Sequence, residues 1–186
     1  MDWQSVRDRD IIKGFYLSQG ALAFLCLALL FLFGDGPALA RALVVFRPFY
    51  LGLSFAVGLA VIAGEWGLER LLPEGWLDDG GINRRVLQAF TTRHLFFAMF
   101  VVAAVEETLF RGLLQPHLGL GLSSLLFGLA HVRYWRKPLM LLVAVLLGFC
   151  FGGLLNVSGG LWAPIAAHYV VDVGLGLLVK RESAKA

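Results

Sequence analysis

The chain has 186 residues, of which 59% are hydrophobic, and its formal net charge is +3. Soluble domains are about 45–50% apolar, and the excess here collects in runs of roughly 15–22 residues, close to the length that crosses a bilayer. The composition therefore excludes an ordinary soluble domain and predicts an integral membrane protein. Lys and Arg are dispersed among the expected helix ends, which disfavours nucleic acid as a partner.

Hydropathy predicts an all-α, polytopic helical bundle with about six transmembrane helices. Helices are expected because every backbone polar group in lipid must be paired internally, and no alternating pattern of short barrel strands is visible. We expect a single membrane-embedded domain over residues 1–186. The six segments are 15–33, 43–64, 94–115, 118–132, 138–156 and 160–179.

The first apolar segment resembles a signal peptide, because basic residues precede it and "ALA" at 38–40 resembles a cleavage site. Its length of about 19 residues exceeds the 7–15 residues usual for a signal peptide. The preceding stretch "MDWQSVRDRD" also carries three aspartates. We expect a helix that is retained in the protein.

The distribution of Lys and Arg predicts the orientation. Thirteen of the sixteen lie on one side of the expected topology, whereas Arg41 and Arg47 lie on the other and Arg111 lies within a helix. By the positive-inside rule, both termini are expected in the cytoplasm, and the expected location is the plasma (inner) membrane of a prokaryote. The one long loop, 65–93, mixes tryptophan and leucine with charges, which predicts an amphipathic segment in the membrane interface.

Two carboxylates and an arginine interrupt the third segment in "VEETLFRGLL". Ionisable groups at the centre of a bilayer cost about 2.5–3.5 kcal/mol each on insertion scales. Glu107 and Arg111 are four residues apart, so they share a helix face and can form an ion pair. Glu106 points about 100° away and has no partner on its own helix. A buried carboxylate in that position is suited to act as a general base or acid.

Two further segments carry polar groups. His131 ends "LLFGLAH" in the fourth segment, one turn after Phe127, and His168 precedes Asp172 by four residues in the sixth. Asp172 could accept a hydrogen bond from His168 and fix its tautomer. A lone histidine or one Glu–Arg pair is often structural. Acids and imidazoles on three helices are too costly for packing alone, and we expect one shared polar site.

Other candidate residues have simpler explanations. Cys26 and Cys150 lie in apolar runs without metal-binding spacing, which is typical of small buried hydrophobes. Ser158 in "NVSGG" lacks the glycine two residues earlier that is found in intramembrane serine proteases, and Asp35 in "FGDG" lacks the preceding glycine of intramembrane aspartyl proteases. No HExxH zinc motif is present in the sequence.

Three motifs together resemble those of the CPBP (Abi) family, which is named for CaaX proteases and bacteriocin-processing enzymes. The stretch "EETLFR" is similar to its EExxxR motif, "FGLAH" to FxxxH, and "HYVVD" to HxxxN/D. Their order and their placement in apolar segments also fit, and the motif-bearing core is about 94–179. Asp172 stands where some relatives have asparagine.

The resemblance implies an intramembrane endopeptidase that cleaves a membrane-associated protein or peptide. It implies that Glu106 and His131 activate a water molecule, while His168 and the residue at 172 stabilise the oxyanion. Glu107, Arg111 and Phe127 would support this site.

Two alternatives remain open at this point. No cofactor is expected, but one carboxylate and two imidazoles could instead bind catalytic Zn²⁺. The chain could also be a non-catalytic scaffold or immunity protein, whose polar cluster holds helices or a partner together.

Overall fold

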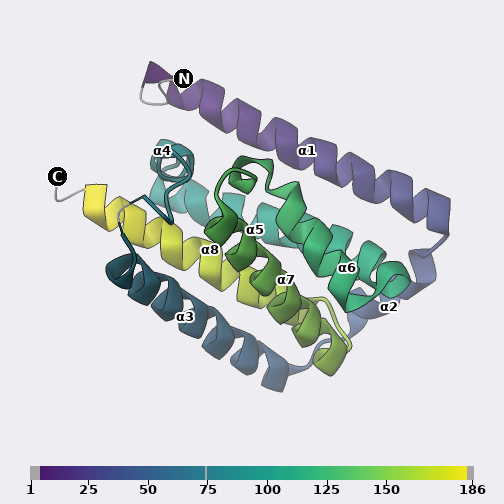
Figure 1. Cartoon of the computed structure of the whole chain (residues 1–186). Helices are drawn as coiled ribbons and strands as arrows, with labels where there is room; N and C mark the ends of the chain where they lie inside the picture. Colours follow the sequence, from purple (N-terminus) through teal and green to yellow (C-terminus); the bar gives the residue numbers. More distant parts are fainter. Residues whose placement is uncertain (1–4, 74, 184–186) are drawn as a thin grey trace.

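The computed structural model describes residues 5–73 and 75–183, and these fold as a bundle of helices (Figure 1). Four helices are long and apolar enough to cross a membrane: α1 (Asp8–Phe33), α3 (Pro48–Leu71), α7 (Pro138–Ser158) and α8 (Trp162–Ser183). The predicted all-α membrane bundle is confirmed. Within the described residues, four of the six expected crossings are therefore single helices that are long enough to span a membrane.

The other two expected crossings are built from shorter pieces. Helix α5 (Thr92–Glu107) has 16 residues and continues directly into a π-helical segment, η2 (Thr108–Leu114). The two together form a continuous helical segment that is longer than α5 alone. Helix α6 (Gln115–Ala130) follows without a loop and is interrupted at Gly119, whose φ is 74°. A positive φ suits glycine, so this residue allows the chain to turn between the two crossings.

Several boundaries differ from those expected from hydropathy. Helix α3 runs on to Leu71, so Trp66 and Leu68 belong to it rather than to an interfacial loop. The amphipathic part of the expected loop is the short helix α4 (Ile82–Ala89). A further short helix, α2 (Gly36–Val44), was not expected; it contains the "ALA" stretch at 38–40 and begins with a proline in its first turn, a position that proline favours.

Helix α8 lies at the centre of the bundle and packs against α3, α5 and α7 (Figure 1). The first turn of α1 and the last turn of α8 lie at the same end, where α4 joins them. Arg85 Nη2 of α4 lies 2.6 Å from Asp8 Oδ1, and Gln88 Nε2 donates to Ser183 Oγ at 2.7 Å. Both described ends of the chain therefore lie on one side of the bundle.

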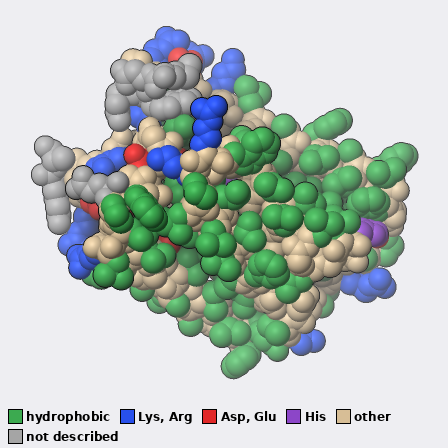
Figure 2. Space-filling model, viewed as in Figure 1, with side chains coloured by type: hydrophobic (Ala, Val, Ile, Leu, Met, Phe, Trp, Pro, Cys, Tyr) green, Lys and Arg blue, Asp and Glu red, His purple; other side chains and the backbone are tan. Residues whose placement is uncertain are grey.

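Large apolar side chains are exposed on the surface in addition to those in the core, and a few ionisable groups are buried. Hydrophobic side chains cover the middle of the visible face in Figure 2, whereas charged ones gather where α4 and the end of α8 lie. On α1, Phe24 is 72% exposed and Phe31 is 92% exposed. Glu107, Arg111 and His168 are instead buried inside. This surface suits lipid tails as the surrounding medium.

Glycines set the close contact between α6 and α7. A Cβ at Gly128 of α6 would lie 2.4 Å from Val145 Cγ2, and one at Gly148 of α7 would lie 2.9 Å from the Cα of Ser124. Small residues let helix backbones approach in this way inside membranes. The resulting contact brings the last turn of α6 next to the polar residues of α5 and η2.

Candidate functional site

The polar residues of the site begin where α5 changes into the π-helical segment. Glu106 and Glu107 are the last two residues of α5, and Arg111 lies within η2. π-Helical turns are rare and occur frequently at functional sites. Nothing in the residue pattern indicated this change of helix type.

Glu107 is fully buried and lies between the side chains of Arg111 and His168. Arg111 Nη1 is 3.1 Å from Glu107 Oε1, which is the ion pair expected from their spacing, and His168 Nδ1 is 2.7 Å from the same oxygen. Arg111 Nη2 also donates to the carbonyl oxygen of Gly148 at 3.1 Å. The carboxylate of Glu107 thus joins η2 and α8, and Arg111 extends the connection to α7.

His168 has a carboxylate on each side of its ring. Its Nε2 lies 3.4 Å from Asp172 Oδ2, one helical turn further along α8, in addition to the contact of Nδ1 with Glu107. Ionised carboxylates only accept hydrogen bonds, so each ring nitrogen that carries a proton can donate to the carboxylate that faces it. Phe151 of α7 stacks on the ring at a centroid distance of 4.9 Å, which fixes its plane.

Phe127 separates the two histidines and covers the arginine. Its ring centroid lies 5.1 Å from that of His131 and 5.9 Å from that of His168, and it is only 2% exposed. The Cζ atom of Arg111 lies 4.2 Å from the centroid of the same ring, a cation–π contact. Phe127 was expected to pack beside His131, and it also contacts the other two groups.

His131 lies just outside α6 rather than inside it. The helix ends at Ala130, and His131 has a non-helical ψ of 64°, so the expected helix boundary at 132 was wrong by two residues. His131 Nδ1 lies 2.8 Å from the carbonyl oxygen of Phe127. Because a carbonyl oxygen only accepts, Nδ1 carries the proton, and Nε2 of a neutral ring is left as an acceptor.

Glu106 has a carboxylate oxygen without a partner. Its Oε2 is buried and has no hydrogen-bond partner among residues 5–73 and 75–183. His168, His131, Asp172 and Glu107 act electrostatically on this carboxylate. The polar residues expected from three helices therefore lie within electrostatic range of Glu106, and the roles assigned to them stay a prediction.

Two residues that sequence reasoning did not select also lie near these polar residues. Glu65 of α3 lies within electrostatic range of Asp172, and Cys150 of α7 precedes Phe151, which stacks on His168. Glu65 was assigned to a loop because it follows the expected end of its helix, and Cys150 was expected only as a small buried hydrophobe. Whether Glu65 and Cys150 lie near the polar site depends on how the helices pack, and no pattern in a single sequence reveals that packing.

The arrangement does not fit the zinc alternative as it stands. In the part of the chain that the structure describes, no three His, Cys, Asp or Glu side chains are gathered closely enough to hold a metal ion. Both nitrogens of His168 face carboxylates, and one nitrogen of His131 faces a backbone carbonyl. A shared site with Glu106 would need these side chains to turn.

Comparison with known proteins agrees with the motifs. Residues 88–174 match the model of a family described as "Type II CAAX prenyl endopeptidase Rce1-like". A Bacillus subtilis (strain 168) protein, named as the uncharacterized protein YpbD, is 32% identical over 139 residues, which cover 75% of this chain and 72% of that protein. No solved structure matches the chain significantly. The chain therefore belongs to the CPBP family, which includes the Rce1-like CAAX prenyl endopeptidases, and is a membrane-embedded peptidase.

Proposed function

We propose that the protein hydrolyses a peptide bond of a membrane-associated protein or peptide, using a water molecule activated by Glu106 and His131 and no metal ion. The observation that carries the proposal is that Glu106 forms no hydrogen bond or ion pair through its side chain among the described residues, and its Oε2 is buried. Glu107 Oε2 is also unpartnered, but Glu107 Oε1 contacts both Arg111 and His168. His131 and His168 lie within electrostatic range of Glu106. A carboxylate oxygen without a hydrogen bond is available to bind a water molecule. Burying it is costly, which argues against a purely structural role.

We assign His131 as the second group that acts on that water. With its proton on Nδ1 held by the carbonyl oxygen of Phe127, the Nε2 lone pair is free to accept a proton. In the proposed step, the water oxygen bonds to the scissile carbonyl carbon and its proton passes to Glu106 or His131. The C–N bond then breaks and the amine leaves with that proton, so that atoms and charges balance.

We assign oxyanion stabilisation to His168, with Asp172 as a positioning residue. The contact of His168 with Glu107 is short at 2.7 Å, whereas that with Asp172 is 3.4 Å. We therefore assign the developing oxyanion to a proton on Nε2, whose contact with Asp172 is the longer one, while Glu107 and Phe151 hold the ring. A donor of this kind is typically worth about 2.7–4 kcal/mol in the transition state.

The test is Glu106→Gln, with Glu69→Gln as a matched control on an exposed carboxylate of α3. Each variant is reconstituted in liposomes with a bacterial membrane fraction in H₂¹⁸O, and newly formed peptide termini are identified by mass spectrometry. Wild-type protein should generate new C-termini that carry one ¹⁸O. Glu106→Gln should lower their rate by about 10²–10⁴-fold, the usual contribution of a general base, and the proposal fails if that variant cleaves at the wild-type rate.

The same experiment separates this proposal from a non-catalytic scaffold or immunity protein. A scaffold would generate no ¹⁸O-labelled termini, and its biological role would survive Glu106→Gln.

We also propose that both termini face the cytoplasm, in the inner membrane of a prokaryote. The asymmetry of Lys and Arg supports this orientation. A C-terminal fusion to alkaline phosphatase should be inactive, and an active fusion would reverse the assignment.

A further inference from the structure

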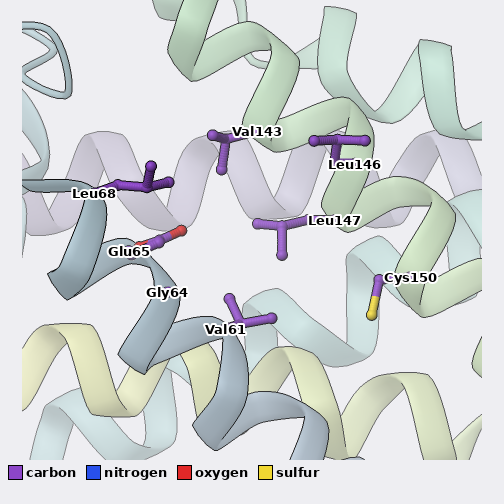
Figure 3. Close-up of a pocket in the computed structure, with 8 residues that line it drawn as sticks. All are labelled: Val61, Gly64, Glu65, Leu68, Val143, Leu146, Leu147 and Cys150. Carbon is purple, nitrogen blue, oxygen red and sulfur yellow. The ribbon is translucent and has the colours of Figure 1, made fainter. Parts of the chain in front are cut away.

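A groove between α3 and α7 adjoins the site. Both helices pack on α8 but diverge from each other, and Figure 3 shows the space between them. The cavity measures about 300 Å³ and is lined largely by apolar side chains such as Val61, Val143 and Leu147. Leu68 and Leu146 at its margins are 37% and 56% exposed, so the groove opens sideways, toward the surrounding lipid.

One carboxylate faces this apolar groove. The side chain of Glu65 projects from α3 toward the space in front of α7 (Figure 3). None of the ion pairs formed by residues 5–73 and 75–183 includes Glu65. The charges that act on it are both negative, those of Asp172 and Glu69. The neighbouring Arg70 stacks on Trp66, with Cζ 3.4 Å from the ring centroid.

The groove also adjoins the polar site through two residues. Asp172, which acts on Glu65, is the residue that faces Nε2 of His168. Cys150 lines the groove, and on the same helix Gly148 accepts a hydrogen bond from Arg111 and Phe151 stacks on His168. An extended chain lying in the groove would therefore pass beside the groups assigned to peptide hydrolysis.

We propose that this groove binds an apolar stretch of the peptide substrate and that Glu65 pairs with a lysine or arginine side chain of that substrate. The inference rests on the proposed function and adds a specificity to it. Charge complementarity supports it, because a carboxylate with only negative neighbours in an apolar groove is stabilised most by a cation. An anionic phospholipid in the groove would be repelled by the same carboxylate.

The first test compares binding of two fluorescent probe peptides to the full-length protein in nanodiscs. Both share one Leu/Ala-rich stretch, and a single position holds Lys in one and Gln in the other. Wild-type protein should bind the Lys peptide about tenfold more tightly, roughly 1.4 kcal/mol in binding free energy. Glu65→Gln should abolish the difference, whereas Glu69→Gln should keep it, because Glu69 does not line the groove. Equal binding of the two peptides by wild-type protein, or an unchanged ratio in Glu65→Gln, overturns the proposal.

A charge-reversal variant tests whether Glu65 recognises the charge of the substrate side chain. Glu65→Lys should favour a third probe peptide that carries Glu at the variable position. A structural role for Glu65 would weaken binding of all three peptides equally, which contradicts the proposal.

A second pair of variants tests the groove itself. A Cβ at Gly64 or at Gly67 meets no atom within 4 Å, so a side chain fits at either position without straining the backbone. Only Gly64 lines the groove. Gly64→Phe should weaken binding of both probe peptides, and Gly67→Phe should leave it unchanged. If native mass spectrometry instead finds a phospholipid that Gly64→Phe displaces, and no peptide binds, the groove is a lipid site and the proposal is wrong.

The two proposals fail separately. Glu106→Gln should keep the preference for the Lys peptide in binding while losing cleavage. Cleavage that survives in Glu106→Gln refutes the proposed function whatever the binding ratio is. Loss of cleavage in Glu106→Gln, together with equal binding of the Lys and Gln peptides by wild-type protein, refutes only the assignment of Glu65.

Discussion

Arg111→Met should destabilise the protein by removing the partner of a fully buried carboxylate. The guanidinium group makes two 3.1 Å contacts, one with Glu107 and one with the carbonyl oxygen of Gly148, and it lies over the ring of Phe127. Methionine replaces the apolar stem of the arginine but ends before the position of the guanidinium group. The substitution therefore removes the charge and the hydrogen bonds while keeping most of the apolar packing of the stem.

The size of the effect follows from what remains around Glu107. Removing one partner of a buried ion pair typically costs about 3–5 kcal/mol, because the other charge is left uncompensated. Glu107 keeps its 2.7 Å contact with His168, so we expect a value near the lower end, about 3 kcal/mol. Such a loss lowers the ratio of folded to unfolded protein roughly 100-fold. Glu107→Gln together with Arg111→Met should recover part of it, with a coupling energy of about 2 kcal/mol.

The free energy of unfolding can be measured in mixed micelles by titration with sodium dodecyl sulfate, followed by tryptophan fluorescence. Arg70→Met is the matched control, because Arg70 forms a cation–π contact on the surface of α3 and should cost no more than about 1 kcal/mol. A loss below about 1 kcal/mol in Arg111→Met, or a coupling below about 0.5 kcal/mol, would show that the pair does not stabilise the fold.

Three further predictions concern packing, the oxyanion and metal. Gly148→Ala should lower the thermal stability in detergent, because its Cβ would lie 2.9 Å from the Cα of Ser124 and overpacking costs about 1–3 kcal/mol. Gly153→Ala is the control and should not lower the stability, because its Cβ meets nothing within 4 Å. Equal effects of the two substitutions would contradict the close approach of α6 and α7. Asp172→Asn should keep peptidase activity within about tenfold of wild type, because the amide can still accept a hydrogen bond from His168 and can also donate one. Asp172→Leu should lower the activity by about 10²-fold or more. A large loss of activity in Asp172→Asn would show that catalysis needs the negative charge of Asp172. Purified protein should contain substoichiometric zinc by elemental analysis, and its activity should resist chelators; stoichiometric zinc with chelator-sensitive activity would overturn the metal-free mechanism.

The helical class and the local pairs could be predicted from the sequence because both depend on short-range periodicity. Long apolar runs indicate helices wherever the surroundings are lipid. Residues four apart share a helix face, which is why the contact between Glu107 and Arg111 and the one between His168 and Asp172 were predictable without a fold.

The contacts between distant segments could not be predicted in this way. His168 reaches Glu107 only because α8 packs closely on α3 and α5, and that packing depends on individual glycines. A Cβ at Gly58 of α3 would lie 2.6 Å from Val170 Cγ1 of α8, and one at Gly176 of α8 would lie 3.0 Å from Leu95 Cδ1 of α5. Between α6 and α7, a Cβ at Gly152 would lie 2.4 Å from Leu120 Cδ1, whereas one at the adjacent Gly153 would meet nothing within 4 Å. Two neighbouring glycines look identical in a sequence, so neither the tight helix contacts nor the partners they bring together are visible there.

The two adjacent glutamates are both costly to bury in a membrane, and the fold gives them different roles. Glu107 faces the bundle interior, where its contacts with Arg111 and His168 connect three helical segments. Glu106, about 100° away around the helix, lies within electrostatic range of both histidines and forms no ion pair within the described chain. The contacts of Glu107 hold the end of α5 against η2 and α8, and so fix where the adjacent Glu106 lies. The ion pair is therefore a condition for an available carboxylate, and weakening it should lower stability and activity together, whereas Glu106→Gln should lower activity alone.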